Sequence, residues 1–184
     1  MLKLKPFLLI SVALNISTAL AQSRDSAGTI EIRSKAENLT AIANSGSEGI
    51  VSGLRIAALP ILRTGEIMEM VPGLIVTQHA GDGKANQYFL RGFNLDHGTD
   101  FATFVNGVPA NMPTHAHGQG YTDLNFLIPE LVDQIAYRKG TYSALDGDFS
   151  AAGSARIEYL KKMDGHLAEA TAGANGYKRL LLAG

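Results

Sequence analysis

Histidine and aspartate side chains gather in one stretch of the sequence, residues 71–120. Four of the five histidines of the chain fall there together with three acids, and the set is His79, His97, His115, His117, Asp82, Asp96 and Asp100. Glycine, asparagine and proline surround them, so most of these side chains lie on turns and loops. Polar side chains on loops that short strands brace are typical of recognition sites, so we expect this stretch to contact a ligand.

Two of the histidines have a spacing that suits a metal ion. His115 and His117 are two residues apart, so both rings project to the same side if residues 114–118 are extended. Metal ligands must converge in this way on one point. The sequence therefore predicts that His115 and His117 act as a pair.

A third histidine, His97, lies in a short polar loop between two aspartates. Neutral imidazole combined with carboxylate suits zinc, copper or nickel better than calcium or magnesium. We expect the two loops to meet at one face and to bind a metal ion, a metal chelate or a polar small molecule through His97, His115, His117, Asp96 and Asp100. The alternative is structural, with the histidines hydrogen-bonding the loops to one another or to surrounding protein.

Arg91 interrupts an otherwise apolar run, Gln87 to Phe93. A guanidinium that is buried in a strand needs a carboxylate partner. The sequence therefore predicts a structural ion pair rather than a substrate contact, with three acids as possible partners: Glu66, Glu69 and Asp123.

The same residues do not form a recognisable catalytic set. Metal hydrolases with a His-x-His pair normally carry an aspartate two residues later, and Gln119 occupies that position. Asp96 and Asp100 could act as an acid and a base, but no oxyanion donors or nucleophile elbow accompany them. Residues 81–84 contain two glycines and a lysine without the spacing of a phosphate loop. We expect a protein that is not an enzyme.

Composition narrows the remaining classes. The chain has 184 residues, 46% of them hydrophobic, which is enough to bury the core of one domain. The formal net charge is −1, so nothing favours a nucleic-acid partner. Cysteine is absent, which excludes disulfides and thiolate metal sites.

The N-terminus is typical of an exported protein. Residues 1–21 combine two lysines, an apolar run and an Ala-Leu-Ala cleavage site, the pattern of a signal peptide. Residues 22–48 are small and polar, which predicts a flexible arm. Within this arm Thr29-Ile30-Glu31-Ile32 alternates like a single strand, and a single strand needs an edge to pair with. It is either an edge strand of the next domain or a docking peptide for another protein.

Short strands and turns fill the rest of the chain. Residues 50–62 favour one or two strands, Thr64 could cap a short helix, and Asp123–Asp133 favours another. Asn106-Gly107 is a strong hairpin signal. Further strands are expected at Leu74–Val76, Gln87–Phe93, Phe101–Val105, Val108–Met112, Gln134–Arg138, Ala155–Leu160, Leu167–Thr171 and Tyr177–Ala183.

Five motifs, taken in order, resemble the plug domain of TonB-dependent outer-membrane receptors. They are the helix, V-P-G and strand of Glu66–Val76, the R-G-F of Leu90-Arg91-Gly92-Phe93, the hairpin Phe104–Pro109 with Gly107, the Lys139-Gly140 turn after Tyr137, and the closing segment Ala151–Ile157. Thr141 departs from the usual proline, and the closing segment keeps only one glycine of a common pair. The motifs cover roughly residues 50–160.

The resemblance implies an α+β fold. A small plug with a mixed, mainly β sheet and short helices would sit inside a transmembrane β-barrel of about 22 strands. The expected organisation is a signal peptide at 1–21, a periplasmic arm with a possible TonB box at 22–48, the plug at 49–160 and the first strands of an incomplete barrel at 161–184.

The function implied by the resemblance is energy-coupled uptake of a scarce ligand across the cell outer membrane. The plug would gate the pore, and a TonB-type periplasmic energy-coupling protein would bind Thr29–Ile32 by strand addition. Gly28 stands where an acid is common, and Glu31 separates two aliphatic residues that are usually adjacent. No cofactor is implied, because a metal ion or chelate would be cargo. The alternatives are a freestanding periplasmic ligand-binding plug and a non-functional receptor fragment.

Overall fold

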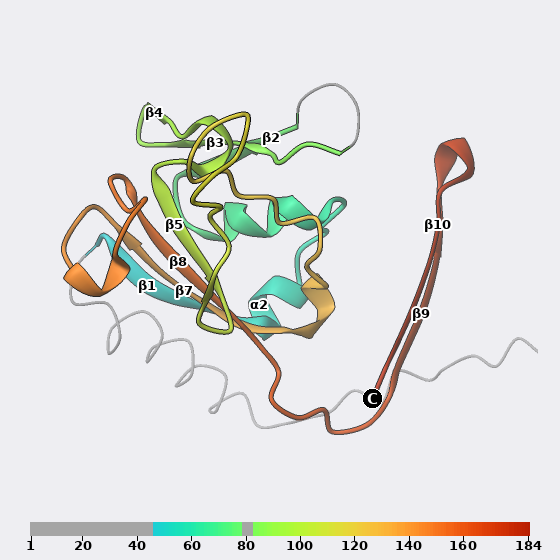
Figure 1. The fold of residues 1–184 in the computed structure, drawn as a ribbon. Coiled ribbons are helices and arrows are strands. Elements are labelled where there is room, and N and C mark those ends of the chain that lie inside the picture. The colour runs from blue at the N-terminus through green and yellow to red at the C-terminus, as the bar shows by residue number, and fades with distance from the viewer. Residues whose placement is uncertain (1–45, 79–82) are drawn as a thin grey trace, which may run out of the picture.

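The computed structural model describes residues 46–78 and 83–184, and Figure 1 shows their fold. The predicted signal peptide and the docking peptide Thr29–Ile32 lie outside the described residues, as do His79 and Asp82. No helix within the described ranges has both the length and the apolar character needed to cross a bilayer.

A five-stranded mixed sheet forms one layer of the fold (Figure 1). Its strand order is β1-β7-β8-β5-β6, with bounds Glu48–Ser52, Val132–Lys139, Gly153–Tyr159, Phe101–Val105 and Val108–Pro109. The β5–β8 pair is parallel and the other pairs are antiparallel. The expected mixed sheet is therefore confirmed.

A second layer of short elements covers one face of this sheet. It contains a three-stranded antiparallel sheet, a short α-helix and several 3₁₀ turns (Figure 1). The bounds are β2 Leu74–Thr77, β3 Gln87–Leu90, β4 Phe93–Asn94, α2 Gly53–Ala57, η2 Thr64–Met70, η3 Asp96–Gly98 and η4 Pro129–Leu131. A further 3₁₀ turn, η5 Ala144–Asp146, lies on the other face of the five-stranded sheet, where Asp146 pairs with Arg156.

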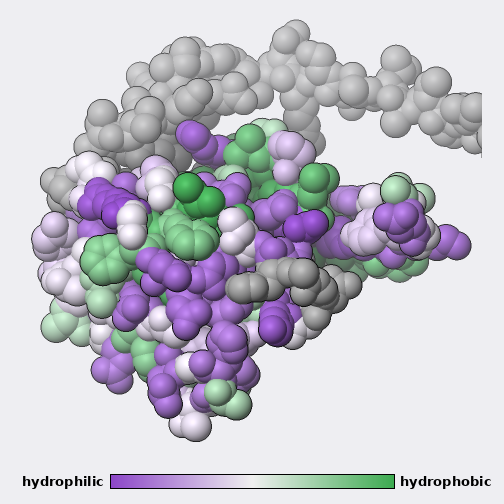
Figure 2. All heavy atoms as spheres, turned by 90° about the horizontal axis from the view of Figure 1, so that it is seen from above, coloured by the Kyte–Doolittle hydropathy of each residue, from purple (hydrophilic) through white to green (hydrophobic). Residues whose placement is uncertain are grey.

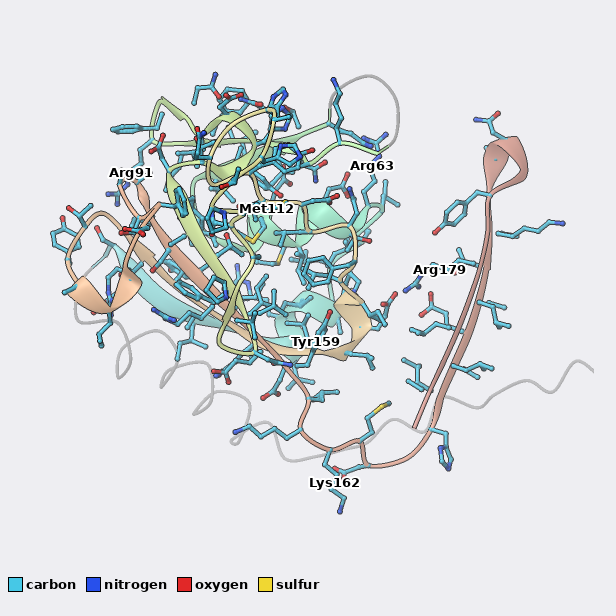
Figure 3. The ribbon with its side chains drawn as sticks, viewed as in Figure 1. Arg63, Arg91, Met112, Tyr159, Lys162 and Arg179 are labelled. Atoms are coloured by element: carbon cyan, nitrogen blue, oxygen red, sulfur yellow. The ribbon has the colours of Figure 1, made fainter. Side chains whose placement is uncertain are left out.

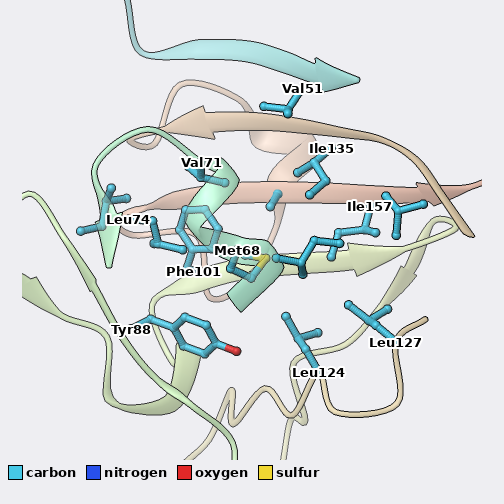
Figure 4. Close-up of a cluster of buried hydrophobic side chains, with 14 of the residues drawn as sticks. Val51, Met68, Val71, Leu74, Tyr88, Phe101, Leu124, Leu127, Ile135 and Ile157 are labelled. Atoms are coloured by element: carbon cyan, nitrogen blue, oxygen red, sulfur yellow. The ribbon is translucent and has the colours of Figure 1, made fainter. Parts of the chain in front are cut away.

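The core lies between these layers, as Figure 4 shows. Ile135 of β7 and Ile157 of β8 are cross-strand partners, and both are fully buried. Phe101 of β5 projects into the same space, and Met68 and Leu90 cover it from the second layer. Burying such side chains stabilises the fold by about 1.5–3 kcal/mol each, which is enough to fix these short strands in one register.

Three local predictions need correction. Residues 53–57 form the helix α2 instead of a second strand. The η2 turn begins at Thr64, but the carboxylate of Glu66, rather than the threonine hydroxyl, accepts the N–H groups of Leu62 and Arg63, each at 3.1 Å. Within 123–133 only η4 is helical, because Pro129 fixes its first residue and β7 begins directly after it.

The chain ends in a separate antiparallel hairpin (Figure 1). Strands β9 (Leu167–Ala172) and β10 (Lys178–Ala183) are joined through the 3₁₀ turn η6 (Ala174–Gly176). Both strands were expected, the first from its alternating pattern and the second from its hydrophobic run, and both are confirmed.

Candidate functional site

A strained loop connects β4 to β5 and holds the first candidate site residues. Asp96, His97 and Gly98 have positive φ angles of 35°, 65° and 94°. For the two residues with side chains this left-handed conformation costs about 1–2 kcal/mol each. Hydrogen bonds from the N–H groups of Gly98 and Thr99 to the carbonyl of Leu95, at 2.8 and 2.7 Å, hold it in place. The backbone therefore turns the His97 side chain inward.

The His97 ring is buried and fixed in orientation. Its Nδ1 lies 2.7 Å from the carbonyl oxygen of Ala85. A carbonyl only accepts hydrogen bonds, so Nδ1 carries the proton, and in the neutral ring Nε2 then carries the lone pair. The N–H of Ala85 in turn donates to the Tyr121 hydroxyl at 2.6 Å. One backbone segment thus connects His97 to Tyr121.

The second histidine loop folds over the first. Residues 114–118 form bends rather than the extended segment on which the predicted pairing of His115 and His117 depended, and both rings contact Tyr121. His115 stacks on the Tyr121 ring with centroids 4.0 Å apart, and its Nδ1 accepts the N–H of His117 at 3.1 Å. The His117 ring meets the edge of His97, with centroids 4.6 Å apart and an angle of 78° between their planes.

Three of the predicted residues come together. Asp96, His97 and His117 each offer a ligand atom, and these atoms lie within 4.8 Å of one another. Asp100 and His115 lie outside this group. The three residues line a hollow of about 520 Å³ together with Thr77, Gln78, Lys84, Gln87, Phe89 and Asn94. Figure 2 views the molecule from the side of the β2–β3–β4 sheet, where hydrophilic residues predominate around this part of the surface.

Asn111 is a supporting residue that the sequence analysis missed. Its buried amide nitrogen lies 3.0–3.1 Å from the carbonyls of Gly98, Phe101 and Gly120, and its oxygen accepts the N–H of Thr103 at 2.7 Å. One side chain thus joins the His97 loop to the loop that carries His117. The only signal in the sequence was an asparagine beyond the end of a hairpin strand, which also suits an ordinary turn.

Residues 40–154, more than half of the chain, match the TonB-dependent receptor plug domain. The chain belongs to this family. The predicted resemblance is confirmed, and so is the plug-like fold.

Several solved receptors contain a similar plug. The chain is 21% identical to the copper transporter OprC, with a TM-score of 0.56, over 77% of this chain and 21% of that chain. A ferric enterobactin receptor mutant from Pseudomonas aeruginosa gives 16% identity and a TM-score of 0.54, over 80% and 22%. The siderophore receptor PirA from Acinetobacter baumannii gives 16% and 0.51, over 74% and 19%. The chain thus spans about a fifth of the length of these proteins, and the likeness concerns the fold.

The prediction of a buried ion pair at Arg91 is wrong. Arg91 and Gly92 form the two-residue turn between β3 and β4, with φ angles of 50° and 84°, and Arg91 is exposed at the margin of the plug (Figure 3). Its guanidinium donates to the Ser47 hydroxyl at 3.2 Å. The expected strand reverses at this point, which carries Arg91 out of the core. The ion pairs found among the described residues do not join it to Glu66, Glu69 or Asp123.

A buried carboxylate of the plug lies elsewhere, at Asp146. This carboxylate is 1% exposed and pairs with Arg138 at 3.1 Å and with Arg156 at 3.0 Å. Arg138 also pairs with Glu48 at 3.1 Å, and the hydrogen bonds that it donates to Glu48 and then to Asp146 raise the pKa of Arg138. The arginines come from the neighbouring strands β7 and β8, Glu48 from β1 and Asp146 from η5, so the charges of four elements meet on the sheet. Sequence reasoning missed this network because Asp146 lies in a glycine-rich loop.

The two other glycines assigned to the plug motifs are structural. Asn106-Gly107 forms the predicted two-residue turn between β5 and β6, with φ angles of 48° and 80°. Gly140 has a φ of 103°, and its N–H donates to the carbonyl of Ala152 at 2.8 Å. These positive φ angles favour glycine over residues with a Cβ.

Proposed function

We propose that this chain forms the plug and the first wall strands of an outer-membrane receptor for energy-coupled uptake of a scarce ligand. The family supports this reading, because the plug domain is a component of TonB-dependent receptors. The C-terminal hairpin is the observation that carries it. In this reading the chain gates and binds rather than catalyses.

The two faces of the hairpin differ in the way that a barrel wall requires. Leu180 and Leu182 pair across the strands with Ala170 and Ala168, so one face is apolar except for Lys178 near the turn. Both leucines are 69% exposed. On the opposite face Leu181 is buried. A sheet with one apolar, exposed face suits contact with lipid, and the other face suits contact with a plug.

An ion pair connects the second face of the hairpin to the plug. The Arg179 guanidinium donates two hydrogen bonds to the Glu130 carboxylate, at 2.6 and 2.9 Å. Figure 3 shows Arg179 extending from the hairpin toward the globular part of the molecule. Glu169 lies 3.5 Å from the same guanidinium. The hairpin therefore faces the plug with its polar side.

The ligand-binding and energy-coupling roles are proposed from where the candidate residues lie in the fold and in the sequence. Asp96, His97 and His117 would contact the ligand in the hollow beside the β2–β3–β4 sheet. A TonB-type periplasmic protein would recruit Thr29–Ile32 as an added strand, with the preceding signal peptide directing export.

Ile30→Pro removes a main-chain donor from that strand and should abolish uptake while the amount of receptor in the membrane stays constant.

Cell fractionation with an antibody against the plug tests the proposal. A product much larger than 19.5 kDa in the outer membrane supports a receptor whose plug and first strands are seen here. A product near 19.5 kDa in the soluble periplasm would contradict uptake by this chain. That second result would favour a freestanding ligand-binding plug.

A further inference from the structure

We infer that Asp96, His97 and His117 form an open binding site for a divalent transition-metal ion of the zinc, copper(II) or nickel class. The inference rests on the proposed function in one respect, because it treats the ion as cargo. It goes beyond that function by naming the ligands and the class of ion. His115 is assigned a different role, as a positioning residue.

The orientation of His97 matches that of a metal ligand. Histidines that bind metals usually donate from the second ring nitrogen to a carbonyl or carboxylate, which fixes the tautomer. Here the Nδ1 of His97 donates to the Ala85 carbonyl at 2.7 Å, so Nε2 is the coordinating atom. This hydrogen bond and the burial of the ring hold His97 in one orientation.

The other two ligands can complete the geometry by small rotations. The three ligand atoms lie within 4.8 Å of one another. Ligands bound to one zinc ion at about 2.0–2.1 Å are about 3.3 Å apart, so the widest separation in the group must contract by up to about 1.5 Å. Asp96 and His117 are exposed, and their side chains are able to rotate toward the fixed His97 ring.

His115 keeps His117 in reach of this point. It stacks on Tyr121, and its Nδ1 accepts the His117 N–H at 3.1 Å. The Tyr121 hydroxyl also accepts the Ala85 N–H. Thus Tyr121 and Ala85 position both histidine ligands.

The number of ligands indicates an exchangeable ion. Two imidazole nitrogens and one carboxylate suit zinc, copper(II) or nickel. Structural zinc sites are closed by four protein ligands, whereas three leave a position for water or another donor. The site therefore suits capture and release more than permanent retention.

Lys84 lines the same hollow and bears on whether the ion enters it alone or bound to a chelator. Its ammonium opposes a bare cation but would attract the carboxylates of an organic chelator. A hydrated ion and an ion held by an anionic chelator can both bind to these three ligands. The experiment therefore tests the free ion and the chelated ion separately.

The test is a zinc titration of the purified chain without a polyhistidine tag. We expect one zinc ion per wild-type chain, and affinity lowered at least about tenfold in His117→Ala and in Asp96→Asn. His115→Ala should weaken binding less than either ligand variant, because it only positions His117. His166→Ala is the matched control, since this exposed histidine borders a different hollow, and it should bind as the wild type does. His97 is not substituted, because its ring also holds Ala85.

Equilibrium dialysis with zinc and radiolabelled citrate distinguishes the two sources. Retention of zinc with the label indicates a chelate, and retention of zinc alone indicates the ion, and both results support the site provided that His117→Ala abolishes them. Equal zinc affinity in wild type and His117→Ala would overturn the inference. Both experiments measure metal binding by the isolated chain, so their results do not depend on where the receptor is located in the cell.

Discussion

At the scale of single residues, the buried polar groups of the plug differ in whether they have hydrogen-bond partners. Asp146 has two arginine partners. Tyr88 is also buried, but its hydroxyl has no hydrogen-bond partner within the described part of the chain. A buried hydroxyl without a hydrogen-bond partner destabilises a fold by about 1–3 kcal/mol. A buried carboxylate with its partners in place does not carry this cost, but replacing it destabilises the fold because its partners lose their hydrogen bonds. Substitutions at these two positions should therefore have opposite effects.

Tyr88→Phe should stabilise the fold by about 1–3 kcal/mol at neutral pH, because it removes the unmatched hydroxyl. Burial, followed by the charges of Asp123 and Tyr121, raises the pKa of Tyr88 above its ordinary value of 10.0. The unfolded chain therefore releases this proton first as the pH rises. At pH 11 this group should cost the wild type about 1.4 kcal/mol of folding stability, and Tyr88→Phe should be spared that loss.

Chemical denaturation at pH 8 and pH 11 measures both effects. Tyr142→Phe is the matched control, because Tyr142 is exposed, and it should behave as the wild type does. The same loss of stability between the two pH values in wild type and Tyr88→Phe would show that Tyr88 ionises freely in the folded state.

Asp146→Asn should destabilise the plug by about 1.5–3 kcal/mol, the range for hydrogen bonds to charged groups. The substitution leaves Arg138 and Arg156 close together without their shared carboxylate. Both guanidiniums are partly exposed, so solvent limits the loss. Urea denaturation checks this value, and the exposed Asp148→Asn serves as the control, with an expected change within about 0.5 kcal/mol. Equal midpoints for the two variants would contradict the prediction.

At the scale of secondary-structure elements, two-residue turns decide where strands end. The β3–β4 and β5–β6 hairpins both use a pair of residues with positive φ, Arg91-Gly92 and Asn106-Gly107. Such turns match the twist of the strands that they connect. They also determine which side chains leave the core, as the exposed Arg91 illustrates.

Gly107→Ala should destabilise the β5–β6 hairpin by about 1–2 kcal/mol, the usual cost of a Cβ in the left-handed region. No atom lies within 4 Å of the Cβ position, so the cost is purely conformational. Gly118→Ala is the control, because Gly118 does not have a positive φ and its nearest neighbour would be at 3.6 Å. Thermal unfolding compares the two variants, and a control as destabilised as Gly107→Ala would refute this explanation.

At the scale of the whole molecule, one ion pair joins the plug to the hairpin. Partial burial alone would raise the pKa of Glu130, but hydrogen bonds from Arg179 outweigh it, so the pKa of Glu130 lies below its ordinary value of 4.5. Its stabilising contribution is present above pH 4.5 and is lost as the pH falls through the lower pKa of the folded state. Contact between the two parts should therefore weaken in acid.

A double-mutant cycle with Glu130→Gln and Arg179→Gln measures this contact. We expect a coupling of about 1 kcal/mol at pH 7, near the upper end for partly exposed pairs because the pair is bidentate. The coupling should decrease as the pH falls below 4.5 and through the lowered pKa of Glu130. Hydrogen exchange of the β9 and β10 amides adds a local readout, and protection should fall in both single variants. A coupling that is independent of pH would exclude the ion pair as its source.

The sequence by itself determined the family, most of the strands and the position of the hairpins. These features depend on neighbouring residues: alternation along a strand, asparagine and glycine at a turn, and short motifs in a fixed order. The His97 and His117 loops were also recognised in this way, because polar residues among turn formers are visible locally. The predicted ion pair of Arg91 was wrong because the sequence around Arg91-Gly92 resembles one continuous strand, whereas the chain turns there.

Only the tertiary structure decided which residues meet. It brought together Asp96, His97 and His117, and it left Asp100 and His115 outside that group. It also placed Asp146 between arginines of two strands. These outcomes depend on backbone angles at single residues and on the packing of segments far apart in the chain, where a change of one φ angle redirects a side chain. Sequence spacing cannot specify such angles, because the contacts that hold them come from the rest of the fold.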